Sequence, residues 1–508
     1  MSRLWPHQNR CLNELAEAIA SGQRKICVTS PTGGGKSRIV FEHIIRANEP
    51  ISLYTDRVML KEQLARNMTE AGLSFGIRAA GHEEDWADVQ ICMIQSEVSR
   101  CVKGGRTIHP AKQVIFDEAH KQVADTSIAI RELHGDVIDI GVTATPLGIG
   151  HVYDHLIIAG TNSELRECGA LVPAHTYGPD EPDTKWVGTV KVDDGECGIA
   201  KSKRMEFAKR VFGSVVEHYH QYNPEQRPAL LFAPGVPEAM YFCEQLTEAG
   251  IPTAHIDGKN CVIDGQVVAT SPEVRDEIAA RSLNGDIKVV TNRFVLREGI
   301  DWPWIYHGIF ATVFGSLTSY LQSGGRILRA HPSLDRVVIQ DHGGNWWRHG
   351  SLNANRDWKL EYTDRIVAGL REKNIREKKE PEPIVCVKCG ACRLSGATCA
   401  KCGYQYVQKS RVVLQKDGIM REMKGDIFRA RRILSESQKI RDEWSGRVRA
   451  IRNSKKPTVQ TMTFAQLDAT FARDHNWQYA PRTCPSMPIK ETDWFRPIKD
   501  VPMGELTR

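Results

Sequence analysis

Residues 30–37 read Ser-Pro-Thr-Gly-Gly-Gly-Lys-Ser, and they separate the apolar run Ile26-Cys27-Val28 from an amphipathic stretch that extends from Arg38 to Ala47. A strand, a glycine loop and a helix in this order form a cradle for nucleotide phosphates. In such a cradle the glycines let backbone N–H groups turn inward at the helix N-terminus, Lys36 reaches the β- and γ-phosphates, and the Ser37 hydroxyl suits Mg²⁺. The other residues expected to line the phosphates are Thr32, Gly33, Gly34 and Gly35. The pattern predicts that ATP and Mg²⁺ bind here, and the alternative is a glycine turn with an incidental Lys-Ser pair.

A second polar cluster follows another apolar run. Residues 114–120 read Val-Ile-Phe-Asp-Glu-Ala-His, which is typical of a buried strand that ends in two carboxylates and a histidine. Asp117 is expected to hold Mg²⁺ through its waters, and Glu118 is expected to polarise the water that attacks the γ-phosphate. His120 is expected beside them at the nucleotide. An Asp-Glu pair at a strand end is often a solvated helix cap, but after a phosphate loop it indicates catalysis.

The phosphate loop resembles that of the superfamily 2 helicases, because it begins with Ser30 and continues Pro-Thr-Gly, more than it resembles the loops of small GTPases or kinases. Residues 117–120 give the DEAH form of that family's second motif. Three further segments match in family order. They are Gly141–Pro146, which resembles the third motif, Thr291–Asp301, which resembles motif V, and Gln322–Arg329, which resembles motif VI.

The resemblance implies roles for residues of the last two motifs. Arg326 and Arg329, three positions apart, are expected on one helical face and would enter the ATP site from a second domain as arginine fingers. The alternative for them is an ion-paired surface helix. Gln322 and Asp301 are expected at the nucleotide too. Near the N-terminus only Gln8 carries over from the family's Arg-x-Tyr-Gln element, whose glutamine recognises adenine, because Leu4 or Trp5 stands where the arginine usually is.

The same resemblance predicts a nucleic-acid groove on the face opposite the ATP site. Arg57, in a segment similar to motif Ia, and Thr291 and Arg293 of motif V are expected to contact it. Such contacts are made mainly to phosphates and carry little sequence information. Motifs III and V resemble the DNA-repair and restriction-translocase branch more than the DEAD-box RNA helicases, so DNA is the expected partner. A protein-remodelling ATPase, an RNA helicase and a binding module that uses ATP as a switch are the alternatives.

The cysteines indicate a separate metal site. Five of the 14 cysteines fall in residues 386–402, where Cys386-x-x-Cys389 and Cys399-x-x-Cys402 are separated by nine residues and each pair is followed by glycine. This spacing is typical of two knuckles around one tetrahedral Zn²⁺, and disulfides are disfavoured in a cytosolic ATPase. Cys392 is expected to be a spare thiol or an alternative ligand.

Charge is distributed unevenly along the 508 residues. Residues 356–508 carry 32 Lys and Arg against 19 Asp and Glu, and residues 1–355 carry 36 against 43. A basic C-terminal third favours a polyanionic partner. The sequence contains no run of about 18 apolar residues, so no membrane contact is expected. The first residues lack the apolar core of a signal peptide, so we expect a cytoplasmic protein of a bacterial or phage-infected cell, with possible replication or repair proteins as partners.

The fold class expected from these patterns is α/β. Strand and helix patterns alternate with the nucleotide motifs at strand ends, and the resemblance implies two tandem RecA-like parallel-sheet domains. A small zinc ribbon and a basic, mainly helical C-terminal region follow. The expected boundaries are 1–170 for the ATP-binding domain, 171–200 for the interdomain connection, 201–350 for the second helicase domain, 351–383 for a helical linker, 384–410 for the zinc ribbon and 411–508 for the basic region.

Overall fold

The computed structural model describes residues 4–56, 58–82, 86–179, 210–293, 296 and 301–360, together with short segments within 384–425. It divides into two compact units. The first unit consists of Met1–Asn345 with Leu352–Glu422 and contains every strand named below, and the second consists of Trp346–Ser351 with Met423–Arg508. Helix α12 (Asn345–His349) begins at Asn345, the last residue of the first segment of unit one, and its other residues belong to the second unit.

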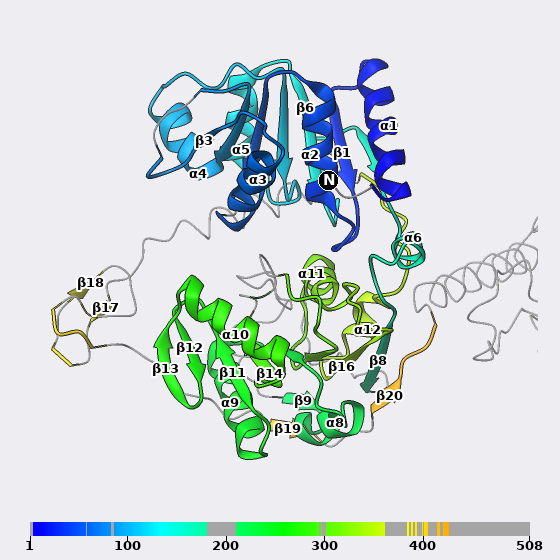
Figure 1. The fold of residues 1–508 in the computed structure, drawn as a ribbon, viewed down its shortest axis with the longest axis vertical. Coiled ribbons are helices and arrows are strands. Elements are labelled where there is room, and N and C mark those ends of the chain that lie inside the picture. The colour runs from blue at the N-terminus through cyan, green and yellow to red at the C-terminus, as the bar shows by residue number, and fades with distance from the viewer. Residues whose placement is uncertain are drawn as a thin grey trace, which may run out of the picture. The chain divides into compact units, whose positions relative to one another are not determined.

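The N-terminal third of the chain forms a seven-stranded parallel sheet in the order β3-β4-β2-β5-β6-β1-β7 (Figure 1). Its strands are β1 (Lys25–Thr29), β2 (Ile51–Thr55), β3 (Gly76–Arg78), β4 (Val89–Met93), β5 (Gln113–Asp117), β6 (Ile138–Thr143) and β7 (His155–Ile158). In β2 and β5, alternate side chains pack on opposite faces, as a strand period of two requires. Leu53 and Ile115 face one cluster, whereas Tyr54 and Phe116 face the other.

Helices cover both faces of this sheet. The face of Leu53 is covered by α1 (Pro6–Ala20), α2 (Lys36–Ala47) and α3 (Val58–Glu70), and the opposite face by α4 (Ile94–Glu97), the π-helical turn η1 (Val98–Lys103) and α5 (Asp125–His134). Because the strands are parallel, the segments that follow β1, β5 and β6 all emerge at one edge. The register confirms this, since Thr29 pairs with Thr143 and Asp117 with Val142.

The second sheet has nine strands in the order β13-β12-β11-β14-β10-β15-β16-β8-β20, of which the six from β11 to β8 are parallel. The central strands are β8 (Ala174–Pro179), β10 (Ala229–Phe232), β11 (Thr253–Ile256), β14 (Val289–Asn292), β15 (His307–Phe310) and β16 (Val337–Asp341). The antiparallel strands are β12 (Asn260–Ile263), β13 (Gln266–Ala269) and β20 (Met420–Glu422). Helices α8 (Val215–Tyr222) and α9 (Val236–Glu248) pack on one face, and α10 (Pro272–Asn284) and α11 (Leu317–Ile327) on the other. Two parallel-sheet α/β domains, as expected, therefore make up most of the described chain.

Strand β8 lies within the segment expected to be an interdomain connection. It pairs with β16 on one side and with β20, about 240 residues later in the chain, on the other. Another distant pair joins β9 (Arg210–Phe212) to β19 (Leu414–Lys416). The described start of the basic region is thus strand: β20 belongs to the second sheet, whereas β19 forms a separate two-stranded sheet with β9. The helices expected in this region and residues 180–200 of the connection lie outside the described residues.

Two local expectations are wrong. Helix α11 ends at Ile327, so Arg326 is helical and Arg329 is not. Beyond the helix, Arg329 forms a β-bridge with Leu171, flanked by hydrogen bonds from Val172 N to Leu328 O and from Ala330 N to Ala170 O. This pairing requires extended backbone, so the two arginines do not share a helical face. Residues 351–360, expected to begin a helical linker, are also non-helical. Within the described part of the chain, no helix is long and apolar enough to cross a membrane.

Candidate functional site

The glycine loop between β1 and α2 has the geometry of a phosphate cradle. Gly33 and Gly35 have positive φ angles of 94° and 73°, which glycine adopts without steric cost. A Cβ added to Gly34 would overlap the Ser30 hydroxyl. Lys36 Nζ lies 3.2 Å from the Ser30 carbonyl oxygen, within the curve of the loop. The loop therefore presents backbone rather than side chains, as close approach to phosphate oxygens demands.

Helix α1 supports this loop from behind. Gln8 is buried, its Oε1 accepts a hydrogen bond from Trp5 N at 3.0 Å, and a Cβ on Gly35 would overlap its side-chain amide. His7, which sequence reasoning did not single out, is also buried, and its Nε2 lies 3.1 Å from the carbonyl oxygen of Gly34. A histidine beside the glutamine carries no motif signal of its own, so only the folded contact identifies it.

The carboxylates at the end of β5 lie at the same sheet edge. Asp117 is the last residue of the strand, and Glu118 follows with a φ of 48°, which is unusual for a residue with a side chain. Glu118 Oε2 lies 3.3 Å from His120 Nδ1, and that nitrogen lies 2.8 Å from Thr143 Oγ1 at the end of β6. Strained backbone at a buried carboxylate is typical of a functional site. The structure therefore brings together the expected second and third motifs.

Residues of the expected motif VI reach this cluster. Gln322, on α11, is buried and its amide donates to Glu118 Oε2 at 3.4 Å. A Cβ on Gly33 would lie 3.6 Å from Arg329 Cγ, and a Cβ on Gly325 would overlap Thr32. Arg326 is half-buried in the last turn of α11. The glycine loop, Glu118 and motif VI thus occupy one neighbourhood.

Asp301 forms an ion pair with Arg329. The carboxylate side chain is 78% exposed, whereas that of the arginine is 19% exposed, so Asp301 holds the arginine from the solvent side. The structure therefore connects Asp301 to the cluster of the glycine loop, Glu118 and motif VI through Arg329.

The residues expected to contact nucleic acid are placed unequally. Thr291 is fully buried, and its hydroxyl lies 3.1 Å from His255 Nδ1. The other ring nitrogen of His255 lies 3.4 Å from Asp257, and the pKa of that carboxyl is lowered because hydrogen bonds from His255 and two backbone N–H groups outweigh its burial. Arg293 is half-buried directly after β14, and Arg57 lies outside the described residues.

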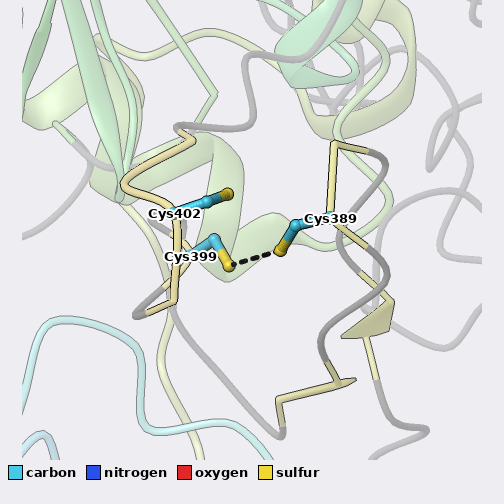
Figure 2. Close-up of side chains that lie close together, drawn as sticks. All are labelled: Cys389, Cys399 and Cys402. Atoms are coloured by element: carbon cyan, nitrogen blue, oxygen red, sulfur yellow. Dashed lines mark hydrogen bonds between the residues drawn. The ribbon is translucent and has the colours of Figure 1, made fainter.

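Three of the four expected zinc ligands converge. The sulfur atoms of Cys389, Cys399 and Cys402 all lie within 4.8 Å of one another, and those of Cys389 and Cys399 are 3.6 Å apart. Figure 2 shows the three side chains directed toward a common point. The backbone N–H of Gly403 donates to the Cys399 carbonyl in a tight knuckle. Thiolates around one tetrahedral Zn²⁺ lie at about this spacing, since each Zn–S bond is about 2.3 Å. Cys386, the fourth expected ligand, lies outside the described residues. Cys392 begins strand β18 (Cys392–Arg393), which pairs antiparallel with β17 (Ile384–Val385).

The donor set fits a magnesium nucleotide. The cradle offers backbone N–H groups and an ammonium for phosphates, while the Ser37 hydroxyl and the Asp117 carboxylate are hard oxygen ligands of the kind Mg²⁺ prefers. Two buried groups of the cluster, Glu118 and Gln322, add hydrogen-bonding capacity beside the loop.

Comparisons with protein families divide the chain in the same way. A model described as "Type III restriction enzyme, res subunit" matches residues 2–148, and one described as "Helicase conserved C-terminal domain" matches residues 213–331. These ranges contain most of the first and second sheets respectively.

Individual relatives are distant. A "51.5 kDa protein" of a Lactococcus phage is 26% identical over 388 residues, which are 75% of this chain and 78% of the phage protein. The "Putative mitochondrial ATP-dependent helicase irc3" of Schizosaccharomyces pombe is 22% identical over 367 residues, which are 67% of this chain and 57% of that protein. Among solved structures, a fragment of a putative HsdR subunit of a type I restriction enzyme from Vibrio vulnificus matches with a TM-score of 0.50 and 15% identity, covering 69% of this chain and 67% of that one. At this identity the likeness shows the fold alone.

Proposed function

Because the chain belongs to the superfamily 2 helicases, whose two domains make an ATP-hydrolysing enzyme, we propose that it is an ATP-dependent DNA translocase or helicase that acts in replication, recombination or repair. The observation that carries the proposal is the contact between Gln322 and Glu118, because it joins a residue of motif VI to the expected catalytic carboxylate. An ATP site completed by residues of both domains couples hydrolysis to their opening and closing.

Each side chain then has a defined task. The backbone of Gly33–Gly35 and the ammonium of Lys36 hold the phosphates, while Ser37 and Asp117 hold Mg²⁺. When bound, Mg²⁺ neutralises charge that develops on the phosphate oxygens. Glu118 accepts the proton of the attacking water, and its hydrogen bond from Gln322 fixes the carboxylate orientation. Arg326 and Arg329 supply positive charge from the second domain.

His120 relates hydrolysis to the third motif. Its Nδ1 lies within 3.3 Å of Glu118 and 2.8 Å of Thr143, and the Thr143 hydroxyl in turn accepts from Thr145 N at 3.1 Å. A movement of the Glu118 carboxylate can therefore be passed through His120 to Thr143 and Thr145 of the third motif, which is expected to lead to the nucleic-acid groove. In the second domain, the hydroxyl of Thr291 lies 3.1 Å from His255 Nδ1. We assign these residues to positioning of the groove rather than to sequence recognition.

DNA is preferred over RNA because the matched family model describes a restriction-enzyme subunit and because the motifs resemble the repair and restriction branch. The proposal is tested on a DNA duplex that carries a third-strand oligonucleotide as a roadblock and a biotin–streptavidin block at one end. A translocase displaces the third strand with ATP, whereas Lys36→Ala and Glu118→Gln do not. Release of streptavidin without strand displacement favours a remodelling ATPase, and no ATP-dependent displacement of either kind contradicts the proposal.

We also assign Zn²⁺ to Cys386, Cys389, Cys399 and Cys402. The protein purified without chelator is expected to contain about one zinc per chain, because a cluster of thiolates in so short a segment is stabilised mainly by its metal. Cys399→Ser, which removes a buried ligand, should abolish the zinc content, and Cys392→Ser is the matched control that keeps it. Metal analysis that finds no zinc in the native protein contradicts this assignment.

A further inference from the structure

Residues Leu352–Leu360 form an irregular segment, here called the strap, that belongs to none of the motifs. The strap follows α12 and contacts α6 (Asn162–Glu167), β8 and α11. Leu352 is 2% exposed and belongs to the core of the second sheet, whereas Asp357 is exposed. The strap therefore contains both anchored and solvent-facing residues.

Hydrogen bonds fasten the strap to helix α6. The Asn162 amide donates to the carbonyl oxygens of Leu352 at 3.2 Å and Ala354 at 2.8 Å. Arg166 donates to the Asn353 carbonyl at 3.1 Å. Asn355 contacts Ser163 twice, accepting from its backbone N–H at 2.9 Å and donating to its hydroxyl at 3.0 Å. Side chains that satisfy this many backbone groups hold an irregular segment in one conformation.

Asn353 fastens the strap to the second sheet as well. Its Oδ1 accepts from Ala174 N at 2.9 Å, and its Nδ2 donates to Ala174 O at 2.8 Å. Ala174 is the first residue of β8, which follows the β-bridge between Leu171 and Arg329. The side-chain amide of Asn353 thus bonds both backbone groups of Ala174, as a neighbouring strand would. This contact lies three residues after Leu171, which pairs with Arg329 of motif VI.

Leu352 connects the strap to α11. A Cβ on Gly324 would lie 2.7 Å from Leu352 Cδ1, so the leucine packs directly on the helix backbone between Gln322 and Arg326. Arg356 and Trp358 of the strap line one pocket together with Pro31 and Thr32 of the glycine loop. The strap therefore touches motif VI on one side and approaches the glycine loop on the other.

We propose that the strap positions motif VI for hydrolysis, with Asn353 and Asn162 as positioning residues that hold Leu352 against α11. The inference rests on the proposed ATPase function and adds a segment to it. Loosening the strap shifts α11, and with it Gln322 and Arg326, relative to Glu118, whose carboxylate Gln322 contacts. The positions of these motif VI residues matter most in the closed state. The rate of turnover therefore depends on the strap more than nucleotide binding does, since the glycine loop stays intact.

The test compares Asn353→Ala and Asn162→Ala with Asp357→Ala, a matched control on the same strap whose side chain is 85% exposed. Steady-state ATP hydrolysis gives kcat and KM for the full chain, and a fluorescent ATP analogue gives the dissociation constant. Asn353→Ala and Asn162→Ala should each lower kcat roughly tenfold while the dissociation constant changes less than about threefold. The kcat of the double variant should be about the same as that of either single variant, because both substitutions act through one segment. Asp357→Ala should match the native protein.

Two outcomes overturn the inference while the native enzyme remains active. One is a kcat within about twofold of native in both asparagine variants, and the other is an equal loss of turnover and nucleotide binding. If Asn353→Ala fails to fold, Asn162→Ala tests the same contact from the side of α6. Absence of turnover in the native protein contradicts the proposed function instead, so the two failures are distinguishable.

Discussion

At the scale of single residues, the glycines of the phosphate loop are set by two separate constraints. Gly35 needs a left-handed backbone and also has no room for a side chain, since a Cβ would overlap the amide of Gln8. Gly72 has a similar φ of 68° but open space around it. The same substitution therefore has different consequences at the two positions.

We predict that Gly35→Ala weakens nucleotide binding at least roughly tenfold, because the loop must shift away from Gln8. Gly72→Ala should bind normally and lose only about 1 kcal/mol of stability, the cost of left-handed backbone. Titration with a fluorescent ATP analogue and urea unfolding measure the two quantities. Equal nucleotide affinity in both variants would contradict the proposed cradle.

Burial of His134 makes the stability of the fold depend on pH. Burial lowers the pKa of His134 to about 4, and its Nε2 lies 2.6 Å from the Tyr54 hydroxyl. The unfolded-state pKa is about 6.5, so the unfolded chain takes up the proton first as the pH falls. His134 therefore costs no stability above a pH of about 6.5. Between pH values of about 6.5 and 4 the free energy of unfolding decreases as the pH falls, and below about 4 this histidine causes no further decrease.

We predict that His134→Gln has a shallower loss of stability between pH 7 and pH 4.5 than the native protein. The largest difference that the pKa shift allows is about 3 kcal/mol. Urea unfolding at the two pH values measures it, and His220→Gln, at an exposed histidine, is the matched control. Identical pH slopes in the His134 variant and the native protein would show that this group does not titrate as described.

At the scale of elements, Arg131 of α5 holds β5 and β6 beneath the carboxylates. Its guanidinium donates to Asp139 on β6 and to the Tyr153 hydroxyl, each at 2.7 Å, and lies 3.7 Å from the ring centre of Phe116 on β5. Asp139 is fully buried. A buried ion pair becomes costly when one partner is removed, because the other charge stays desolvated.

We predict that Arg131→Met destabilises the first domain by about 3–5 kcal/mol, the usual effect of leaving a buried charge without its main partner. The matched control is Arg46→Met, which removes an exposed arginine paired with Glu42 on α2 and should change stability by less than about 0.5 kcal/mol. Chemical unfolding followed by circular dichroism measures both. A loss below about 1 kcal/mol in Arg131→Met would mean that Asp139 is satisfied by other groups.

Sequence alone predicted the elements that carry motifs, since apolar runs that end in Gly, Lys, Asp or Glu define both the strand and the edge where its residues emerge. Local sequence could not predict the pairing of β8 with β20, because contacts between residues so far apart leave no periodic signal. For the same reason it missed the end of α11 before Arg329 and the strap. His7 was missed because it acts through one contact with the loop carbonyl.

At the scale of the whole molecule, the first unit combines two sheets whose motif residues lie together at the proposed ATP site. The family matches cover most of the same two sheets. The basic balance of residues 356–508 falls mostly outside the described residues, so its role as an electrostatic contact to DNA stays a prediction from composition. The central claim is that ATP hydrolysis at Glu118 depends on nucleic acid bound across both domains.

The most direct test is the rate of ATP hydrolysis by the native protein with no polymer, single-stranded DNA, duplex DNA and RNA, with Glu118→Gln measured in parallel. We predict that DNA raises turnover by roughly tenfold or more, in the range typical of coupling between two sites, and that RNA raises it less. Glu118→Gln should bind ATP and remain inactive under all four conditions. Equal native turnover with and without every polymer, or native-like turnover in Glu118→Gln, would contradict the account.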